Sequence, residues 1–483
     1  MWSVLLVFAA TYILIAARRL SILPIGRPAG ALAGACAMVL LSAIEPGAGL
    51  TPHEAFAAVE PNTIGLLLGM MLLSASLDVA GVFERAAAWV SRRNLSPVRL
   101  LYLVTLGAGL ASAVLLNDSV CVMLAPLVDR TARRAGLDRV PYLLALAMGA
   151  NAGSALTLAG NPQNMLVGQL SGIQYRAYLL EAGPAALIGL AVTAAMLHLM
   201  LRRRIAVQAS APASATPAPA SATPAPASAT PAPASATLAS ATHAPASATP
   251  APESAAPAPA SATLASATPA PASATPAHAP ESAAPALTRG ARPSALVPLA
   301  CLAVVSVLFV LGANLAWTAI GGATAAILLH RRDASGLFDR ISWTVLVFFG
   351  ALFIVVAGLQ KTGMPEQALR DASPYLPAGP TLGLLGLSIA MLVGCQIVSN
   401  VPFILLAESY IRSQPDPHLA WIATAVVSTL AGNLTLLGSV ANIIVVETVG
   451  AEREIGFRSY ARVGVPVTLA STAAALLWLL LVR

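Results

Sequence analysis

The chain has 483 residues, of which 57% are hydrophobic and only 10% are charged, and its mean hydropathy is +0.78. This composition excludes a soluble globular protein and predicts an all-α polytopic membrane protein. The net charge of +7 at pH 7 does not indicate a nucleic-acid partner, because basic residues in a membrane protein usually report its topology. Four cysteines scattered through apolar sequence show no spacing typical of a zinc site, and no cofactor is expected.

Ten apolar segments, five in each half of the chain, are predicted to cross a hydrocarbon core of ~30 Å. They lie near residues 2–17, 28–45, 60–79, 141–171 and 181–201, and near 295–312, 313–330, 343–361, 419–449 and 460–482. Two further apolar segments, 97–130 and 379–412, are too long for one simple span and are interrupted by asparagine motifs. We expect each of them to form a re-entrant hairpin. Residues 83–94, in which Trp89 lies among arginines, are predicted to form an interfacial amphipathic helix that leads into the first hairpin.

Residues 209–287 are almost entirely Ala, Ser, Thr and Pro. Such a segment has too little apolar bulk to pack and too many prolines for a helix or a sheet. We therefore expect a disordered cytoplasmic linker over 205–294, which separates a first repeat at 1–204 from a second at 295–483.

One polar and glycine-containing pattern occurs twice in this apolar sequence. Residues 156–167 align with residues 434–445 without a gap, at an offset of 278 positions, and Asn400 follows Asn117 by 283. Polar groups and helix breakers at bilayer depth are tolerated where they line a cavity or are buried in protein. Paired breaks in the two halves of a chain indicate the binding site of a transporter.

The positive-inside rule tests this layout. If both hairpins are re-entrant, the 27 basic residues gather on the cytoplasmic side, with few exceptions. The exceptions are Arg176, Lys361, Arg370, Arg412 and Arg483. Both termini are then expected outside. Because five crossings in each half is an odd number, the second half should insert upside down, as an inverted repeat with one broken helix in each half.

The hairpin tips and helix breaks are predicted to form the binding site. A helix N-terminus near mid-membrane favours an anion. Amide, hydroxyl and carbonyl oxygens suit a sodium ion, which we place at Asn117, Asp118 and Asn400. The candidate substrate- and ion-binding residues are Asn117, Asp118, Ser119, Gly160, Asn161, Asn164, Ser399, Asn400, Thr435, Gly438, Ser439 and Asn442.

Two alternatives stay open for these residues. Asp118 is the only carboxylate expected deep in the membrane, where ionisable groups are costly and usually functional. It either binds the coupling ion or proton, or only caps the helix expected over 119–129. Asn117 and Asn400 either bind the transported species or form a hydrogen bond between helices.

Four motifs in order resemble the ion transporter superfamily, which includes citrate-transporter-like proteins, arsenite permeases, sodium/dicarboxylate symporters and sodium/proton antiporters. They lie at 117–126, 160–164, 399–402 and 431–442. The resemblance implies a scaffold domain that dimerises and a transport domain that moves as an elevator. It maps the tip asparagines of the family to Asn117 and Asn400, and the unwound-helix motifs to 160–164 and 438–442. Dicarboxylate symporters carry Ser-Asn-Thr at both tips, whereas this chain has Asn-Asp-Ser and Ser-Asn-Val.

We therefore predict a secondary active transporter of a small anion, an inorganic oxyanion or a carboxylate, coupled to sodium or protons. The alternative is an arsenite efflux permease or a sodium/proton antiporter of the same fold. The spans contain no HExxH or Gly-x-Ser-x-Gly motif, so an enzyme is not expected. The expected partners are the small anion, the lipid bilayer and a second copy of the chain, in a bacterial cytoplasmic (inner) membrane.

Overall fold

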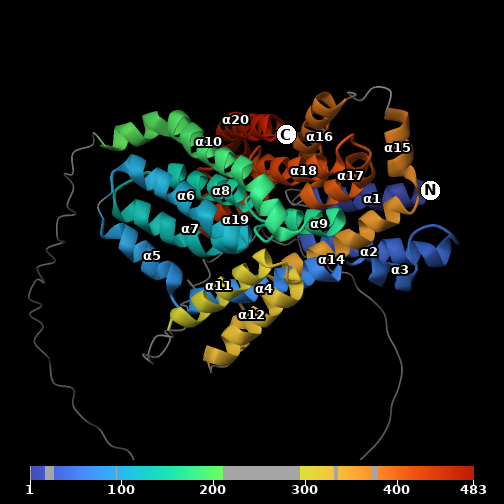
Figure 1. Cartoon of the computed structure of the whole chain (residues 1–483), viewed down its shortest axis with the longest axis horizontal. Coiled ribbons are helices and arrows are strands. Elements are labelled where there is room, and N and C mark those ends of the chain that lie inside the picture. The colour runs from blue at the N-terminus through green and yellow to red at the C-terminus, as the bar shows by residue number, and fades with distance from the viewer. Residues whose placement is uncertain are drawn as a thin grey trace, which may run out of the picture. The chain divides into compact units, whose positions relative to one another are not determined.

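Helices make up the regular secondary structure of the described residues in the computed structural model (Figure 1). The structure describes residues 2–16, 27–93, 95–209, 294–330, 335–372 and 379–482. The predicted linker lies almost entirely outside these ranges. The all-helical prediction is confirmed.

The helices of the first half follow the predicted order. They are α1 (Trp2–Ala16), α2 (Arg27–Ile44), α3 (Pro52–Ala58), α4 (Pro61–Val79), α5 (Val82–Ser91), α6 (Pro97–Val114), α7 (Asn117–Arg134), α8 (Arg139–Ser154), α9 (Pro162–Ser171) and α10 (Tyr175–Ala209). The predicted amphipathic helix is α5, and the predicted first hairpin is the α6–α7 pair.

The second half repeats this order. Its helices are α11 (Leu296–Val310), α12 (Leu315–His330), α13 (Ser335–Phe338), α14 (Trp343–Gln360), α15 (Met364–Ala372), α16 (Pro380–Val398), α17 (Asn400–Arg412), α18 (Pro417–Ala431), the 3₁₀ turn η2 (Leu436–Gly438), α19 (Val440–Thr448) and α20 (Phe457–Leu481). The second predicted hairpin corresponds to α16 and α17.

Six helices of the described residues are long and apolar enough to cross a membrane: α4, α6, α10, α14, α16 and α20. This set includes α6 and α16, the first arms of the two predicted hairpins. Length and composition therefore do not separate a re-entrant arm from a full crossing here. The re-entrant geometry and the inverted insertion of the halves stay predictions.

Small residues bring the first hairpin close to the first broken helix. At Gly153 of α8 a β-carbon would stand 2.2 Å from the backbone of Gly109 in α6, and at Gly149 it would stand 2.4 Å from the carbonyl oxygen of Thr105. Real β-carbons do not approach other atoms this closely, so both positions depend on glycine. The sequence thereby lets α6 lie directly along α8.

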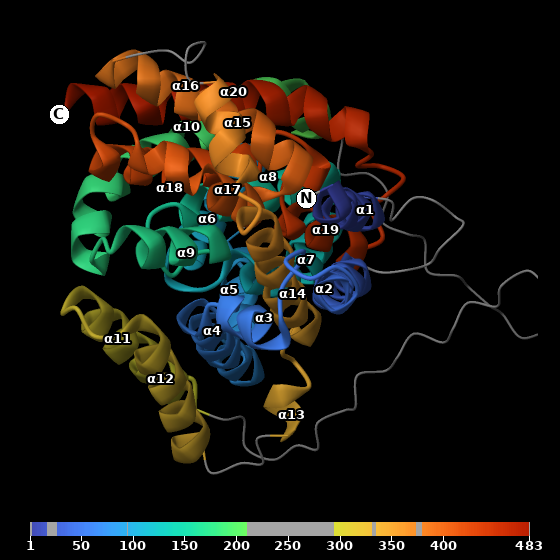
Figure 2. The same ribbon diagram turned by 90° about the vertical axis from the view of Figure 1, so that its right-hand side faces the viewer.

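The two halves pack across one another. In the first half α7 and α8 contact α19 of the second, and α9 contacts α17 and α18 (Figures 1 and 2). The second segment of each broken helix therefore lies against the hairpin and the broken helix of the other half. This crossed packing brings the predicted motifs of both halves into one region.

A cluster of charges surrounds Arg139. Arg139, at the start of α8, donates to Glu454 (2.5 Å) and Asp129 (3.0 Å), and to the carbonyl oxygens of Val449 (3.0 Å) and Gly450 (3.3 Å). The hydrogen bonds from Arg139 lower the pKa of the Glu454 carboxyl below its usual range. The cluster links the first hairpin to the loop that follows α19.

Candidate functional site

Each half of the chain contains one helix that is interrupted in its middle. The first break separates Ser154, the last residue of α8, from Pro162, the first of α9. The second separates Ala431 of α18 from Val440 of α19. At Gly160 in the first break a β-carbon would stand 2.4 Å from the carbonyl oxygen of Ser154, so only glycine fits the closely folded backbone.

An asparagine closes each break through the same pair of hydrogen bonds. Asn164 Nδ2 donates to the carbonyl oxygens of Ser154 (3.2 Å) and Thr157 (3.0 Å). Asn442 Nδ2 donates to the two carbonyl oxygens that lie 278 positions further along the chain. These belong to Gly432 (2.8 Å) and Thr435 (3.2 Å). Carbonyl groups that the breaks free from helical bonding are thus satisfied, and the offset of the sequence repeat is reproduced in three dimensions.

Asn151 of α8 connects the first half to the second. It is only 2% exposed, and its Nδ2 donates to Asn433 Oδ1 (3.0 Å) and Asn442 Oδ1 (2.9 Å). Its Oδ1 accepts from Asn117 Nδ2 (3.0 Å) and Ser439 Oγ (3.0 Å). These four bonds use the full hydrogen-bonding capacity of one amide. Asn151 therefore positions the first hairpin tip against the second broken helix.

Thr429 of α18 occupies the equivalent place in the second half, 278 positions after Asn151. Its hydroxyl lies 3.0 Å from Asn164 Oδ1 and accepts from Asn161 Nδ2 (3.1 Å). Asn161 also caps α9, because its Oδ1 accepts from the backbone N–H of Asn164 (2.8 Å). Each broken helix is thus held by a polar side chain from the other half.

The first hairpin tip is joined to the first break. The backbone N–H of Asn117 donates to the carbonyl oxygen of Gly160 (3.0 Å). The side chain of Asn117 is 4% exposed, and its Oδ1 is buried with no hydrogen-bond partner among the described residues. A buried acceptor of this kind is costly unless a ligand supplies the missing contact.

The second tip has the same feature in a different backbone setting. Asn400 is 7% exposed, and its Oδ1 also lacks a partner in the described part of the chain. Ser399, just before it, has a φ of 74°, the one positive value among described residues other than glycine. Gln396 ties this hairpin to the second break, since it donates to the carbonyl oxygen of Ala431 (2.9 Å) and accepts from Thr435 Oγ1 (2.8 Å).

Asp118 lies in the first turn of α7 and is 8% exposed. The residue at the N-cap of α7 is Leu116, and no side chain caps this helix. Asp118 is therefore not the helix cap considered from the sequence. Its carboxylate makes no hydrogen bond or ion pair with the described residues. Ser119, its neighbour, is only partly buried.

The structure brings most of the predicted site residues into one hydrogen-bonded network. The network contains Asn117, Gly160, Asn161, Asn164, Thr435, Ser439 and Asn442. Four predicted site residues are not bonded to this network through their side chains within the described part of the chain: Asp118, Ser119, Ser399 and Asn400. Gly438 lies at the second break, where a β-carbon would stand 2.8 Å from Gln396 Oε1.

Sequence reasoning missed five residues that join this network through their side chains: Asn151, Ser154, Asn433, Thr429 and Gln396. The repeat offset could have identified one pair among them, because it places Thr429 opposite Asn151 as a second polar residue in an apolar helix. Within the described residues no group of three or more His, Cys, Asp or Glu side chains could hold a metal ion. The sodium site predicted at Asn117, Asp118 and Asn400 would consist of amide and carboxylate oxygens.

A family model described as "Citrate transporter" (CitMHS) matches residues 5–431. The chain belongs to the citrate transporter family. The family and the named relatives of this chain are transporters, so the chain is a membrane transporter of this family and not an enzyme.

Several curated proteins are similar to this member of the citrate transporter family over most of their length. A silicon efflux transporter of Oryza sativa is 34% identical over 93% of this chain and 92% of its own. A putative transporter, arsB, of Dictyostelium discoideum is 34% identical over 92% of this chain and 86% of its own. A 46 kDa membrane protein of Mycobacterium leprae is 26% identical over 98% of this chain and 97% of its own.

A solved structure shares the fold. The YdaH transporter of Alcanivorax borkumensis covers 99% of this chain, and 96% of its own length is matched, with a TM-score of 0.51 and 14% identity. At this identity the likeness concerns the fold alone.

Proposed function

We propose that this chain is a secondary active transporter that moves a small anion, an inorganic oxyanion or a carboxylate, by coupling to sodium or protons. One observation supports this most directly: Asn117 Oδ1 and Asn400 Oδ1 are both buried without a hydrogen-bond partner in the described structure. Amide oxygens are suitable ligands for a hard cation. Asn117 and Asn400 also stand at the N-termini of α7 and α17, where positive potential favours an anion.

In this proposal Asp118 carries the coupling. Its carboxylate follows Asn117 directly and is buried without a described partner. A carboxylate in this setting can accept a proton, or can bind sodium together with Asn117 and Asn400. Either event neutralises a charge that is costly to keep at bilayer depth, and so links cation binding to the transport cycle.

The remaining features of the proposal concern assembly and movement. The two halves, 1–204 and 295–483, would insert as inverted repeats joined by the linker 205–294, with both termini outside. The scaffold would dimerise in a bacterial inner membrane, and the transport domain would move as an elevator. The reproduction of the 278-residue offset in the bonds of Asn164 and Asn442 supports a structural repeat.

A second candidate function is the efflux of a small oxyacid, such as an arsenic or silicon acid. Two relatives at 34% identity are named a silicon efflux transporter and a putative transporter, arsB. The buried polar residues of the described structure also favour it. Arg139 is the single basic side chain among them, and it is already bonded to Asp129 and Glu454. A site of amides and hydroxyls can bind an uncharged acid without a counter-charge, whereas a buried citrate trianion needs one.

Flux measurements in liposomes test the proposal. Citrate, arsenite and silicic acid are offered to the wild-type protein across imposed pH and sodium gradients. We expect one of them to accumulate in a manner that depends on one gradient. Sodium movement in the absence of any of these acids would favour a cation antiporter instead.

The variant Asp118→Asn tests the coupling role. It keeps the side-chain shape and removes the charge, so folding should survive while the dependence of flux on pH or sodium is lost. Asp339→Asn, at an exposed position, is the matched control and should keep the wild-type dependence. Unchanged coupling in Asp118→Asn contradicts the assignment of Asp118.

A further inference from the structure

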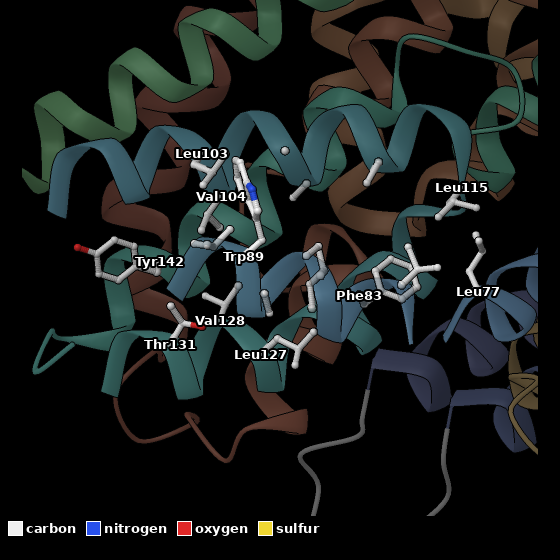
Figure 3. Close-up of a pocket in the computed structure, with 18 of the residues that line it drawn as sticks. Leu77, Phe83, Trp89, Leu103, Val104, Leu115, Leu127, Val128, Thr131 and Tyr142 are labelled. Atoms are coloured by element: carbon white, nitrogen blue, oxygen red, sulfur yellow. The ribbon is translucent and has the colours of Figure 1, made fainter. Parts of the chain in front are cut away.

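A cavity of about 400 Å³ lies between the amphipathic helix α5 and the α6–α7 pair, and no residue of the asparagine network lines it (Figure 3). Side chains of α5 lie on one side of it, and those of the hairpin arms α6 and α7 complete much of the wall. Figure 3 shows Trp89 at its centre, Thr131 and Tyr142 toward one end, and Leu77 and Leu115 toward the other. The volume is within the range of ligand pockets, ~300–1,000 Å³.

The cavity is lined almost wholly by hydrocarbon. The lining residues with a polar group in their side chains are Trp89, Thr131 and Tyr142. The Tyr142 hydroxyl already donates to the carbonyl oxygen of Pro97 (3.2 Å). A stable water needs about two to four polar partners. Neither water nor a small polar substrate suits this space, whereas an acyl chain does.

The cavity is also elongated. Its lining residues on α6 extend from Leu100 to Ala111, which corresponds to about 16 Å along a helix that rises 1.5 Å per residue, and Leu115 continues the lining just after the end of α6. One leaflet of a bilayer has a hydrocarbon depth of about 15 Å, half of the ~30 Å core. A single lipid chain can therefore lie along the cavity.

The charges at the end of α5 specify the headgroup. Arg92, Arg93 and Arg99 are exposed, and none of them is paired with an acidic side chain of the described residues. The Arg93 guanidinium lies over the Trp89 ring, 4.2 Å from its centroid. Tryptophan and arginine together are typical of the membrane interface, and guanidinium groups bind phosphate.

We propose that this cavity binds one acyl chain of an anionic phospholipid, with the headgroup phosphate held by Arg92 and Arg93. The bound chain contacts both arms of the first hairpin and reaches Leu115, two residues before Asn117. The lipid thereby fills the space between α5 and the hairpin and supports the arms that carry the first tip.

Native mass spectrometry of the full chain tests this proposal. The detergent-purified protein is titrated with phosphatidylglycerol and, separately, with phosphatidylcholine of the same chains. We expect phosphatidylglycerol to bind at least tenfold more tightly. The double variant Arg92→Gln/Arg93→Gln should weaken phosphatidylglycerol by about fivefold for each arginine removed and leave phosphatidylcholine unchanged. The exposed pair Arg202→Gln/Arg203→Gln is the control and should keep the wild-type preference.

A cavity-filling variant tests the chain site independently of charge. Gly107 lines the cavity, and a β-carbon there meets no atom within 4 Å, so Gly107→Leu can enter the space without a clash. It should reduce the binding of both lipids by tenfold or more. Gly321→Leu, at another exposed helical glycine with open space, should bind like the wild type.

Three results overturn the proposal: equal affinity for both lipids, full phosphatidylglycerol binding by Gly107→Leu, or a dimer that Gly107→Leu dissociates. The last result would assign the cavity to a second copy of the chain. If Gly107→Leu fails to fold, the double variant Arg92→Gln/Arg93→Gln decides. Loss of the lipid preference in that variant supports the proposal, and retention of the preference refutes it.

Discussion

Replacing Asn151 by leucine removes the most connected side chain of the asparagine network. Leucine has a similar size, so the change mainly removes hydrogen bonds. It leaves four partner atoms unpaired, on Asn117, Asn433, Ser439 and Asn442. In water-soluble proteins each buried donor or acceptor left without a hydrogen-bond partner costs about 1–3 kcal/mol of stability. In membrane proteins the measured average is only about 0.6 kcal/mol per side-chain bond between helices, because the unfolded state also finds partners in the membrane.

We take the lower value, since Asn151 lies within a helix of a membrane protein, and expect Asn151→Leu to lose about 2 kcal/mol of unfolding free energy. Thr429→Val, which removes two contacts between the halves, should lose about half as much. Thr193→Val is the control. Thr193 is fully buried, but its hydroxyl donates only to the Gly189 carbonyl oxygen of its own helix (2.8 Å), so its loss should be smaller still.

The assay is reversible unfolding in mixed micelles, with the denaturing detergent fraction varied, for the wild type and the three variants. Substrate binding by the same samples shows whether the tips have moved. Equal losses for Asn151→Leu and Thr193→Val would refute the view that the bonds between the halves stabilise the site.

Two further predictions concern the charges at the edges of the structure. Because Arg139 lowers the pKa of Glu454, ionised Glu454 adds stability above the ordinary glutamate pKa of about 4.3, and this stability is lost as the pH falls through the lowered pKa of the folded protein. The unfolding midpoints of the wild type and Glu454→Gln should therefore differ most at neutral pH and converge in acid, and a constant gap would contradict this reasoning. For topology, Arg133→Cys and Arg202→Cys should react with a membrane-impermeant thiol reagent from the cytoplasmic side and Arg370→Cys from outside. Labelling of Arg133→Cys and Arg370→Cys from one side would exclude the inverted arrangement.

Local sequence signals predicted the helices and their breaks well. Hydropathy located the apolar helices, and Gly160 and Pro162 marked the first break because each restricts the backbone in its own way. Hydropathy did not locate the end of α10, which continues through Arg202 to Ala209. The apolar segment ends where the arginines begin. The helix continues beyond it, because arginine is a good helix former.

Two parts of the structure were not predicted: one has a local signal in the sequence, and the other has none. The short helix α3 begins with a capping box in which Thr51 and Glu54 bond each other's backbone, and this Thr-x-x-Glu signal was present in the sequence. The bonds that Asn151 and Thr429 make to the other half are different, because they join positions more than 260 residues apart. No local pattern specifies which distant amide a side chain will meet.

The bonds between the halves also set an order of events during synthesis. The Asn164 side chain meets Thr429, a residue 265 positions later in the chain. At ~5–20 residues per second, a ribosome needs roughly 13–53 s to supply that partner. During this interval the first broken helix exists without the second half, although its own bonds to Ser154 and Thr157 can already form. A chain stalled or truncated before Thr429 therefore contains a complete first hairpin beside an unfinished binding site, and exposes to the membrane the polar groups that degradation machinery can recognise.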